Sequence, residues 1–368
     1  MKALLHLSIA AAFFSQVAYA EPTDIAGFSQ AYQQYNVSLE SHNNQDTLKY
    51  AQQAYELGQI KFGKHNLDSA KLAINWANAL MVEPKKTNQG RVIEDKATLK
   101  AHQLLTSALV VYRENVTDNG IELIDPLLGL AESTTDDKYA KTLLFEAIEI
   151  AEKADNELTL AEVKLIAFYR LTGTQFYTRK VRDFVFDADD IYSRELAENA
   201  IQRVDASYLA GALYESMGKP SQAIVKLVEV IKQYQALPYS HPYELRAHAL
   251  LVTLYEQKDQ GAKATEHCVA IGKMTPWNDQ QEQTPLFRKP PQYPQSYAQR
   301  RKSGWVQVEF TVDENGFVKS PEIIDSKGGI QFEKESIQAL SQWRYAPKFV
   351  DGKPTSAKST VQIEFSLG

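Results

Sequence analysis

The chain has 368 residues, more than one ordinary core requires, so we expect two domains. Its composition, 44% hydrophobic and 23% charged, is typical of a soluble globular protein. The formal net charge of -6 provides no basic field to gather phosphates, which excludes nucleic acid from the expected partners.

The N-terminal end has the features of a secretory leader. Lys2 precedes an apolar run that closes with a small-x-small cleavage signature at residues 18–20. We therefore predict a cleaved signal peptide at residues 1–20, a mature chain that starts at Glu21, and a periplasmic location. The alternative is an uncleaved leader that anchors an energy transducer in the inner membrane. It rests on His6, because ionisable residues inside apolar membrane segments are candidates for function.

Residues 21–277 carry apolar side chains at spacings of three and four, which predicts stacked amphipathic helices. The clearest unit is 206–235, where the turn Gly218-Lys219-Pro220-Ser221 separates two helical stretches. Gly211, Tyr214, Gly218 and Ala223 stand at the spacing of a tetratricopeptide repeat. In that repeat, small residues allow paired helices to approach each other. A second copy runs from about Tyr243 to Pro276. Segments starting at Ala54 and ending near Ala131 resemble the same repeat.

Residues 140–200 are helical by pattern but cannot be phased into repeats. Asp183, Asp187, Asp189 and Asp190 lie within them and resemble a fragment of a calcium loop. The glycine and the distal glutamate of that loop are missing, so we interpret the cluster as a solvated acidic turn. An enzyme site in this segment is the remaining hypothesis of another class, although no motif supports it.

Cys268 is the single cysteine and has no intramolecular partner, so the fold does not depend on disulfides. Its helical surroundings predict a small buried hydrophobe. Neighbouring Glu266 and His267 point in different directions on a helix, so we expect no shared metal. The sequence also lacks the motifs of phosphate loops, dinucleotide sites, nucleophile elbows and zinc-protease helices. We predict no enzyme, no cofactor and no metal.

Composition changes at residues 278–290, where Gln, Pro and charged residues predict an extended, semi-rigid linker. Residues 291–368 then follow a different period. Alternation from Val306 to Val312, a turn at Asp313-Glu314-Asn315-Gly316 and a second strand over 317–324 predict a hairpin. A helix over 332–343 and a final alternating strand that ends with Phe365 and Leu367 complete the order strand, strand, helix, strand. Such a sheet leaves an open edge.

The same region carries a set of motif residues along its whole length: Pro291-x-Tyr293-Pro294, Ala298, Gly304, Val306 to Val312, Asp313-x-x-Gly316-x-Val318, Ser326, Phe332, Ala339, Trp343-Arg344-Tyr345-x-Pro347, Gly352-x-Pro354 and Phe365. This set resembles the C-terminal domain of the TonB family. Taken together, the fold class expected for the chain is α+β multidomain. An N-terminal α-solenoid of tetratricopeptide type at 21–277 precedes a small ββαβ domain at 291–368.

The resemblance implies a periplasmic domain that binds outer-membrane transporters. Such a domain adds the transporter's short N-terminal segment to its sheet as an extra strand. Carried onto this sequence, the contact residues would be Tyr293 and Pro294 near the domain entrance and the pairing strand Ser359, Thr360, Val361, Gln362, Ile363, Glu364 and Phe365. Tyr293 and Pro294 have an alternative reading as caps of the linker. Trp343 and Tyr345 are expected in the core.

This chain differs from the energy-transducing members of that family. Its leader looks cleavable, and a repeat domain stands where those members carry a Pro-rich spacer. We therefore expect a periplasmic adaptor. Its sheet would bind a transporter or another protein of the TonB system, and its repeat groove would bind a second protein or peptide. The open edge also allows a strand-paired homodimer.

Overall fold

In the computed structural model the described residues are 22–82, 93–237, 241–275, 277 and 283–367. The predicted signal peptide with His6 lies outside them, as do Pro276 and residues 278–282 of the predicted linker. Contacts divide the chain into two compact units, Met1–Phe184 and Val185–Gly368. Among the helices within the described ranges, none combines the length and the apolarity that crossing a membrane requires.

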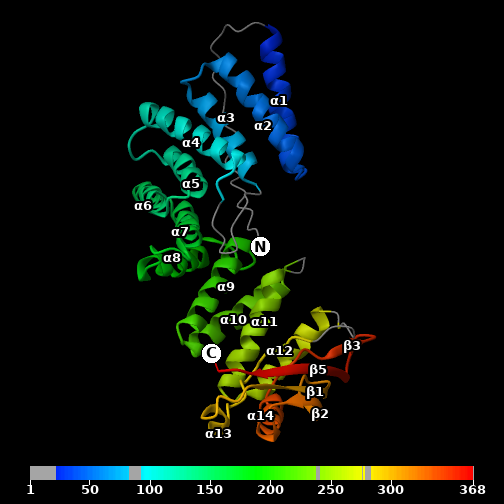
Figure 1. Ribbon diagram of the computed structural model, residues 1–368. Helices are drawn as coiled ribbons and strands as arrows, with labels where there is room; N and C mark the ends of the chain where they lie inside the picture. Colours follow the sequence, from blue (N-terminus) through cyan, green and yellow to red (C-terminus); the bar gives the residue numbers. More distant parts are fainter. Residues whose placement is uncertain (1–21, 83–92, 238–240, 276, 278–282, 368) are drawn as a thin grey trace. The chain divides into compact units, whose positions relative to one another are not determined.

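The first unit is an array of helices in which each helix packs against the next along the chain (Figure 1). Several helices begin at an Asn or Asp whose side chain accepts a hydrogen bond from a backbone N–H of the first turn, as Asn43, Asn66, Asp95, Asp136 and Asn156 do. The elements are α1 (Pro22–Glu40), α2 (Asn44–Phe62), α3 (Leu67–Met81), α4 (Lys96–Asn115), η1 (Ile121–Leu123), α5 (Ile124–Ser133), α6 (Asp137–Lys153) and α7 (Glu157–Leu171). Helix α8 (Arg179–Glu195) spans the boundary between the units. The helical prediction for this region is confirmed.

The second unit begins with two helical hairpins, α9 (Ile201–Ser216) with α10 (Pro220–Gln235), and α11 (Pro242–Gln257) with α12 (Gly261–Met274). The predicted turn at Gly218 is confirmed, because Gly218 has a φ of 67°, a conformation that glycine adopts readily. The structure also explains why position 211 holds a glycine, since a Cβ there would lie 2.9 Å from the Leu227 side chain. The hairpin has the close helix approach expected of a tetratricopeptide-like repeat.

The unit ends in a small antiparallel sheet, which within residues 283–367 has the strand order β2-β1-β5 (Figure 1). Its elements are α13 (Gln295–Ala298), β1 (Gly304–Val312), β2 (Val318–Lys327), α14 (Ile330–Leu340), β3 (Lys348–Val350), β4 (Lys353–Thr355) and β5 (Ala357–Phe365). Helix α14 packs against β1 and β2, and the core contains Val308, Phe310, Phe332, Trp343 and Ile363. The predicted ββαβ order is confirmed, as is the core position of Trp343 and Tyr345.

Three predicted features differ in detail. The helix ends at Leu340 and not at Trp343. Leu367, expected to continue the final strand, lies beyond β5 and is exposed. A further two-stranded hairpin, β3 with β4, precedes β5, and its turn residues Asp351 and Gly352 both have positive φ. Trp343 and Tyr345 therefore follow the helix as an extended, buried segment that precedes the added hairpin.

Candidate partner-binding site

The sheet of the second unit has two edges, and β5 forms the more regular one. All nine residues of β5 pair with β1, from Gly304↔Phe365 to Val312↔Ala357, without a shift in register. Strand β1 lies between β5 and β2 in the strand order. The outer side of β5 is therefore a straight nine-residue edge, the form of surface that an extended peptide can join.

The register indicates which backbone groups face that edge. The N–H of Asp313 donates to the carbonyl of Phe317 and so points toward β2. Because successive residues of a strand point their backbone groups to opposite sides, Val312 and Phe310 point theirs toward β5. Their partners Ala357 and Ser359 point back toward β1. The N–H and C=O groups of the alternate residues then face the free edge: Lys358, Thr360, Gln362 and Glu364.

The other edge, β2, is irregular. Its pairing with β1 shifts register twice, between Gln307 and Val308 and between Glu309 and Thr311. Ser320 has a φ of 48°, and Pro321 follows it without a backbone N–H. Bulges, proline and charged residues are the means by which natural sheets protect an edge against added strands. Of the two edges, β5 is the one without a register shift, a positive-φ residue or a proline.

Burial alternates along the predicted pairing strand. Ser359, Val361, Ile363 and Phe365 are buried against the core, whereas Thr360, Gln362 and Glu364 are exposed. Strand β5 thus pairs with β1 through its backbone, packs one face into the core and presents polar side chains on the other face. That this strand is a partner-binding edge stays a prediction, and the strand has the regular pairing that strand addition requires.

The exposed face of the sheet carries an ion pair that the sequence reasoning did not identify. The Nζ of Lys358 donates to Oε1 of Glu309 on β1 at 2.7 Å. This hydrogen bond raises the pKa of Lys358. Lys358 and Glu309 are diagonal neighbours in the β1–β5 register, so their pairing depends on the strand alignment and could not be read from the sequence.

Tyr293 and Pro294, also predicted as contact residues, take part in the domain's own structure. The ring of Tyr293 lies edge-on to Phe332 and Phe365, with centroids 5.4 and 5.9 Å away. Its hydroxyl donates to the carbonyl of Lys302. Pro294 precedes α13, and its carbonyl accepts from the N–H groups of Tyr297 and Ala298. Both residues are half-buried. Tyr293 contacts β5 through Phe365, and the role of both residues as partner contacts stays a prediction.

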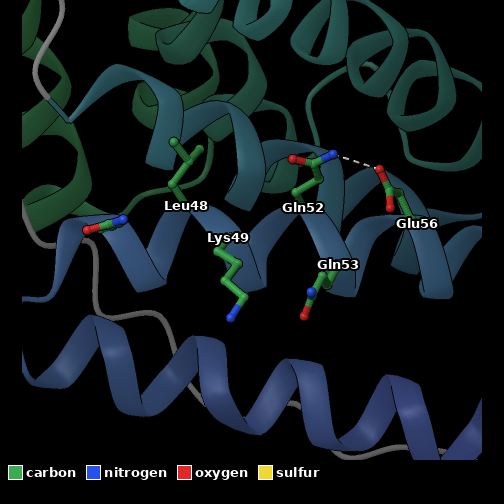
Figure 2. Close-up of a pocket in the computed structure, with 6 residues that line it drawn as sticks. Leu48, Lys49, Gln52, Gln53 and Glu56 are labelled. Atoms are coloured by element: carbon green, nitrogen blue, oxygen red, sulfur yellow. Dashed lines mark hydrogen bonds between the residues drawn. The ribbon is translucent and has the colours of Figure 1, made fainter.

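A hollow in the first unit is lined by residues of one helix, α2, most of which have polar side chains (Figure 2). The amide of Gln52 donates to the carboxylate of Glu56 at 2.8 Å, one turn along the helix. The remaining lining residues are Gln45, Leu48, Lys49 and Gln53. Residues that recur at intervals of three and four lie on one face of a helix, and polar side chains on such a face indicate that it is solvated. It does not bring together the acid, base and nucleophile that a catalytic site needs.

The comparison with known families decides the class of the sheet domain. The model of the family described as Gram-negative bacterial TonB protein C-terminal matches residues 289–367. Residues 289–367 are a TonB C-terminal domain. The match begins within the polar segment before Tyr293, and it includes Phe365 and every other residue of β5.

Individual relatives match stretches of about the same length as the family match. The protein TonB of Escherichia coli K12 is 39% identical over 82 residues, which cover 22% of this chain and 32% of that protein. The protein TonB of Pseudomonas aeruginosa is 30% identical over 83 residues, covering 23% of this chain and 24% of that protein. The chain thus spans about a quarter to a third of the curated relatives it matches, and each match covers less than a quarter of this chain.

A structural likeness to the helical part is more distant. A crystal structure of a putative kinesin light chain with TPR-like repeats from Podospora is 15% identical, with a TM-score of 0.41. It covers 54% of this chain and 89% of that chain. The helical region is tetratricopeptide-like by the geometry of its own hairpins, seen at Gly211 and Gly218.

Proposed function

We propose that this protein is a non-enzymatic adaptor of TonB-dependent transport in the periplasm of a Gram-negative bacterium. Its TonB domain binds the N-terminal segment of an outer-membrane transporter, or another protein of the TonB system, by adding a strand at the β5 edge. Its helical repeats bind a second protein or peptide. The TonB relatives support the transport role, and the two binding architectures in one chain support the adaptor role.

The observation that carries the strand-addition proposal is the contrast between the two edges. β5 pairs with β1 over nine residues without a register shift, while β2 has two shifts, a left-handed Ser320 and a proline. An added strand would form backbone hydrogen bonds with the residues whose N–H and C=O groups face the β5 edge. Such bonds provide affinity with little dependence on side-chain identity, and pockets for alternate side chains provide selectivity.

The proposal is tested by removing one donor at this edge. Gln362→Pro deletes the outward-facing N–H of Gln362 without touching the bonds to β1, because proline is tolerated on edge strands where the N–H faces solvent. The affinity of residues 21–368 for synthetic peptides that copy transporter N-terminal segments is measured by calorimetry. We expect Gln362→Pro to weaken binding roughly tenfold or more, since the peptide carbonyl facing this donor loses its partner.

The matched control is Gln362→Thr, which keeps the backbone N–H donor and introduces a side chain that favours strands. It should bind the peptides within about twofold of the unmodified chain. Circular dichroism of both variants must show an intact sheet. Equal affinities of the Pro and Thr variants, or binding of no transporter peptide by the unmodified chain, would remove the strand-addition proposal.

A further inference from the structure

The second unit joins its last helical hairpin to its TonB domain through a buried arginine. Arg344 follows α14, forms isolated β-bridges with Phe287 and Phe317, and is 1% exposed. Its Nη1 donates to Oε1 of Glu256 on α11 at 2.6 Å, and its Nη2 donates to Oγ1 of Thr265 on α12 at 2.7 Å. The pairing crosses 88 residues of sequence.

Within the TonB domain, the partners of Arg344 are neutral. Its Nη2 also donates to the carbonyl of Asn315 at 3.1 Å, and the guanidinium lies 3.7 Å from the centre of the Phe317 ring. The carboxylate that balances this charge, among the described residues, is Glu256 on the helical hairpin. A buried cation without its carboxylate is strongly destabilising, so separating the hairpin from the domain is disfavoured.

Apolar contacts surround the ion pair. Val252 of α11 and Cys268 and Ile271 of α12 form a buried cluster, and the partly buried Leu286, Phe287 and Ala346 pack against it. Gly272 of α12 lies so close to Pro347 that a Cβ would overlap the proline carbonyl. Helix α12 also packs against β3 and β4. The hairpin and the domain thus share a small core, which holds them together by burial as well as charge.

The polar segment before the domain is part of the same contact. Leu286 and Phe287 donate their N–H groups to the carbonyl of Arg344, and Arg344 donates its own to the carbonyl of Phe287. The indole N–H of Trp343 donates to the carbonyl of Lys289 at 2.8 Å. Thr253 of α11 donates to the carbonyl of Leu286. This part of the polar stretch is therefore pinned between the hairpin and the domain.

We propose that the α11–α12 hairpin is a docking surface for the chain's own TonB domain, that Arg344 is its anchor, and that hairpin and domain stay one body in solution. A pull on a strand bound at β5 would then be transmitted to the helical repeats directly and not absorbed by slack before the domain. The inference goes beyond the proposed function, and its test needs no transporter peptide. Its failure is thus separable from failure of strand addition.

The native chain contains its own reporter of docking. Cys268 is the single cysteine, is fully buried, and lies against Gly316 and Arg344 of the TonB domain. Burial raises the pKa of its thiol to about 11, which keeps it unreactive while the domain is docked. The experiment measures the rate at which Ellman's reagent modifies Cys268 in residues 21–368 under native conditions.

Two variants loosen docking by independent routes. Glu256→Gln leaves Arg344 without its carboxylate. Gly272→Ala places a methyl group against Pro347, and it cannot act by weakening α12, since alanine favours a helix over glycine. We expect both to react about tenfold or more faster than the native chain, at unchanged helical circular dichroism.

The matched controls make the same substitutions away from the docking surface. Glu309→Gln breaks the exposed pair with Lys358, and Gly27→Ala adds a methyl group that meets only an ordinary contact with Leu57. Both should react at the native rate. The proposal is overturned if Glu256→Gln and Gly272→Ala stay within about twofold of the native rate, or if their faster reaction only follows a loss of helical signal.

Discussion

Asp189 shows how one buried acid can tie three helices together. Its Oδ1 accepts from the Ser207 hydroxyl of α9 at 2.5 Å, and its Oδ2 pairs with the Lys226 ammonium of α10 at 2.8 Å. The side chains of Asp189 and Lys226 are 11% and 20% exposed. A carboxylate with so little access to water is costly to bury unless such partners satisfy its oxygen atoms.

Removing the cation tests this interpretation. Lys226→Met keeps the aliphatic stem and leaves Asp189 without its charge partner, so we expect the free energy of unfolding to fall by roughly 3 kcal/mol. Arg113→Met removes one partner of the exposed pair with Glu146, and should change the free energy of unfolding by less than about 1 kcal/mol. Urea unfolding of both variants measures the difference. Equal losses would show that burial of Asp189 carries no energetic weight.

The sequence interpretation of this acidic cluster was wrong, and the reason is physical. Asp183, Asp187, Asp189 and Asp190 were expected in a solvated turn, but all lie within α8. The partners that stabilise Asp189 come from residues 18 and 37 positions further along the chain. A local pattern of charge cannot show which member of a cluster will meet such partners when the helices pack.

At the scale of elements, periodic patterns were the reliable guide. The alternation of Val306, Val308, Phe310 and Val312 is the burial pattern of β1. The turn before Gly316 has the expected geometry, since the carboxylate of Asp313 accepts from the N–H groups of Asn315 and Phe317. Gly316 itself has a φ of 80°. Both features are local, so the sequence contains the information that determines them.

The sequence pattern did not predict elements that are too short to show a periodic spacing of apolar residues. Strands β3 and β4 have three residues each, too few for alternation to be recognised, although their turn Asp351-Gly352 carries a hairpin signal. Leu367 continued the alternation in sequence but lies past the last residue paired with β1. The free edge at β5 could be expected from the strand count. Its regularity, and the two register shifts of β2, required the structure.

The contact between the α11–α12 hairpin and the TonB domain is also a feature that required the structure. Arg344 was part of the motif that revealed the domain, but its partner Glu256 lies 88 residues earlier in a helix whose pattern indicates only packing. The family match, which covers residues 289–367, contains the arginine without the carboxylate. Sequence reasoning on either part alone could not have joined them.

At the scale of the whole molecule, stability should depend on pH through a pair of histidines. The Nδ1 atoms of His248 on α11 and His267 on α12 are 2.8 Å apart, and His267 stacks on Tyr255. Burial lowers the pKa of both histidines to about 4, and the neighbouring His267 contributes further to the lowering of the pKa of His248. In the unfolded chain their pKa is near its ordinary value of 6.5.

Between pH 6.5 and pH 4 the unfolded chain therefore binds protons that the folded chain does not. The stabilisation is fully present above pH 6.5 and is lost as the pH falls toward 4. We expect the urea midpoint to drop between pH 7 and pH 5, and to drop less in His248→Phe. His65→Gln, at an exposed position, should follow the native chain. A pH dependence that is unchanged in His248→Phe would contradict this assignment.

The most direct test of strand addition is residue-by-residue amide hydrogen exchange of residues 21–368, by nuclear magnetic resonance, with and without a transporter N-terminal peptide. Thr360, Gln362 and Glu364, whose N–H groups face the free edge of β5, should exchange freely in the unbound chain and become protected when the peptide binds. Protection that appears along β2, or a bound peptide that protects no residue of β5, would contradict the proposed function.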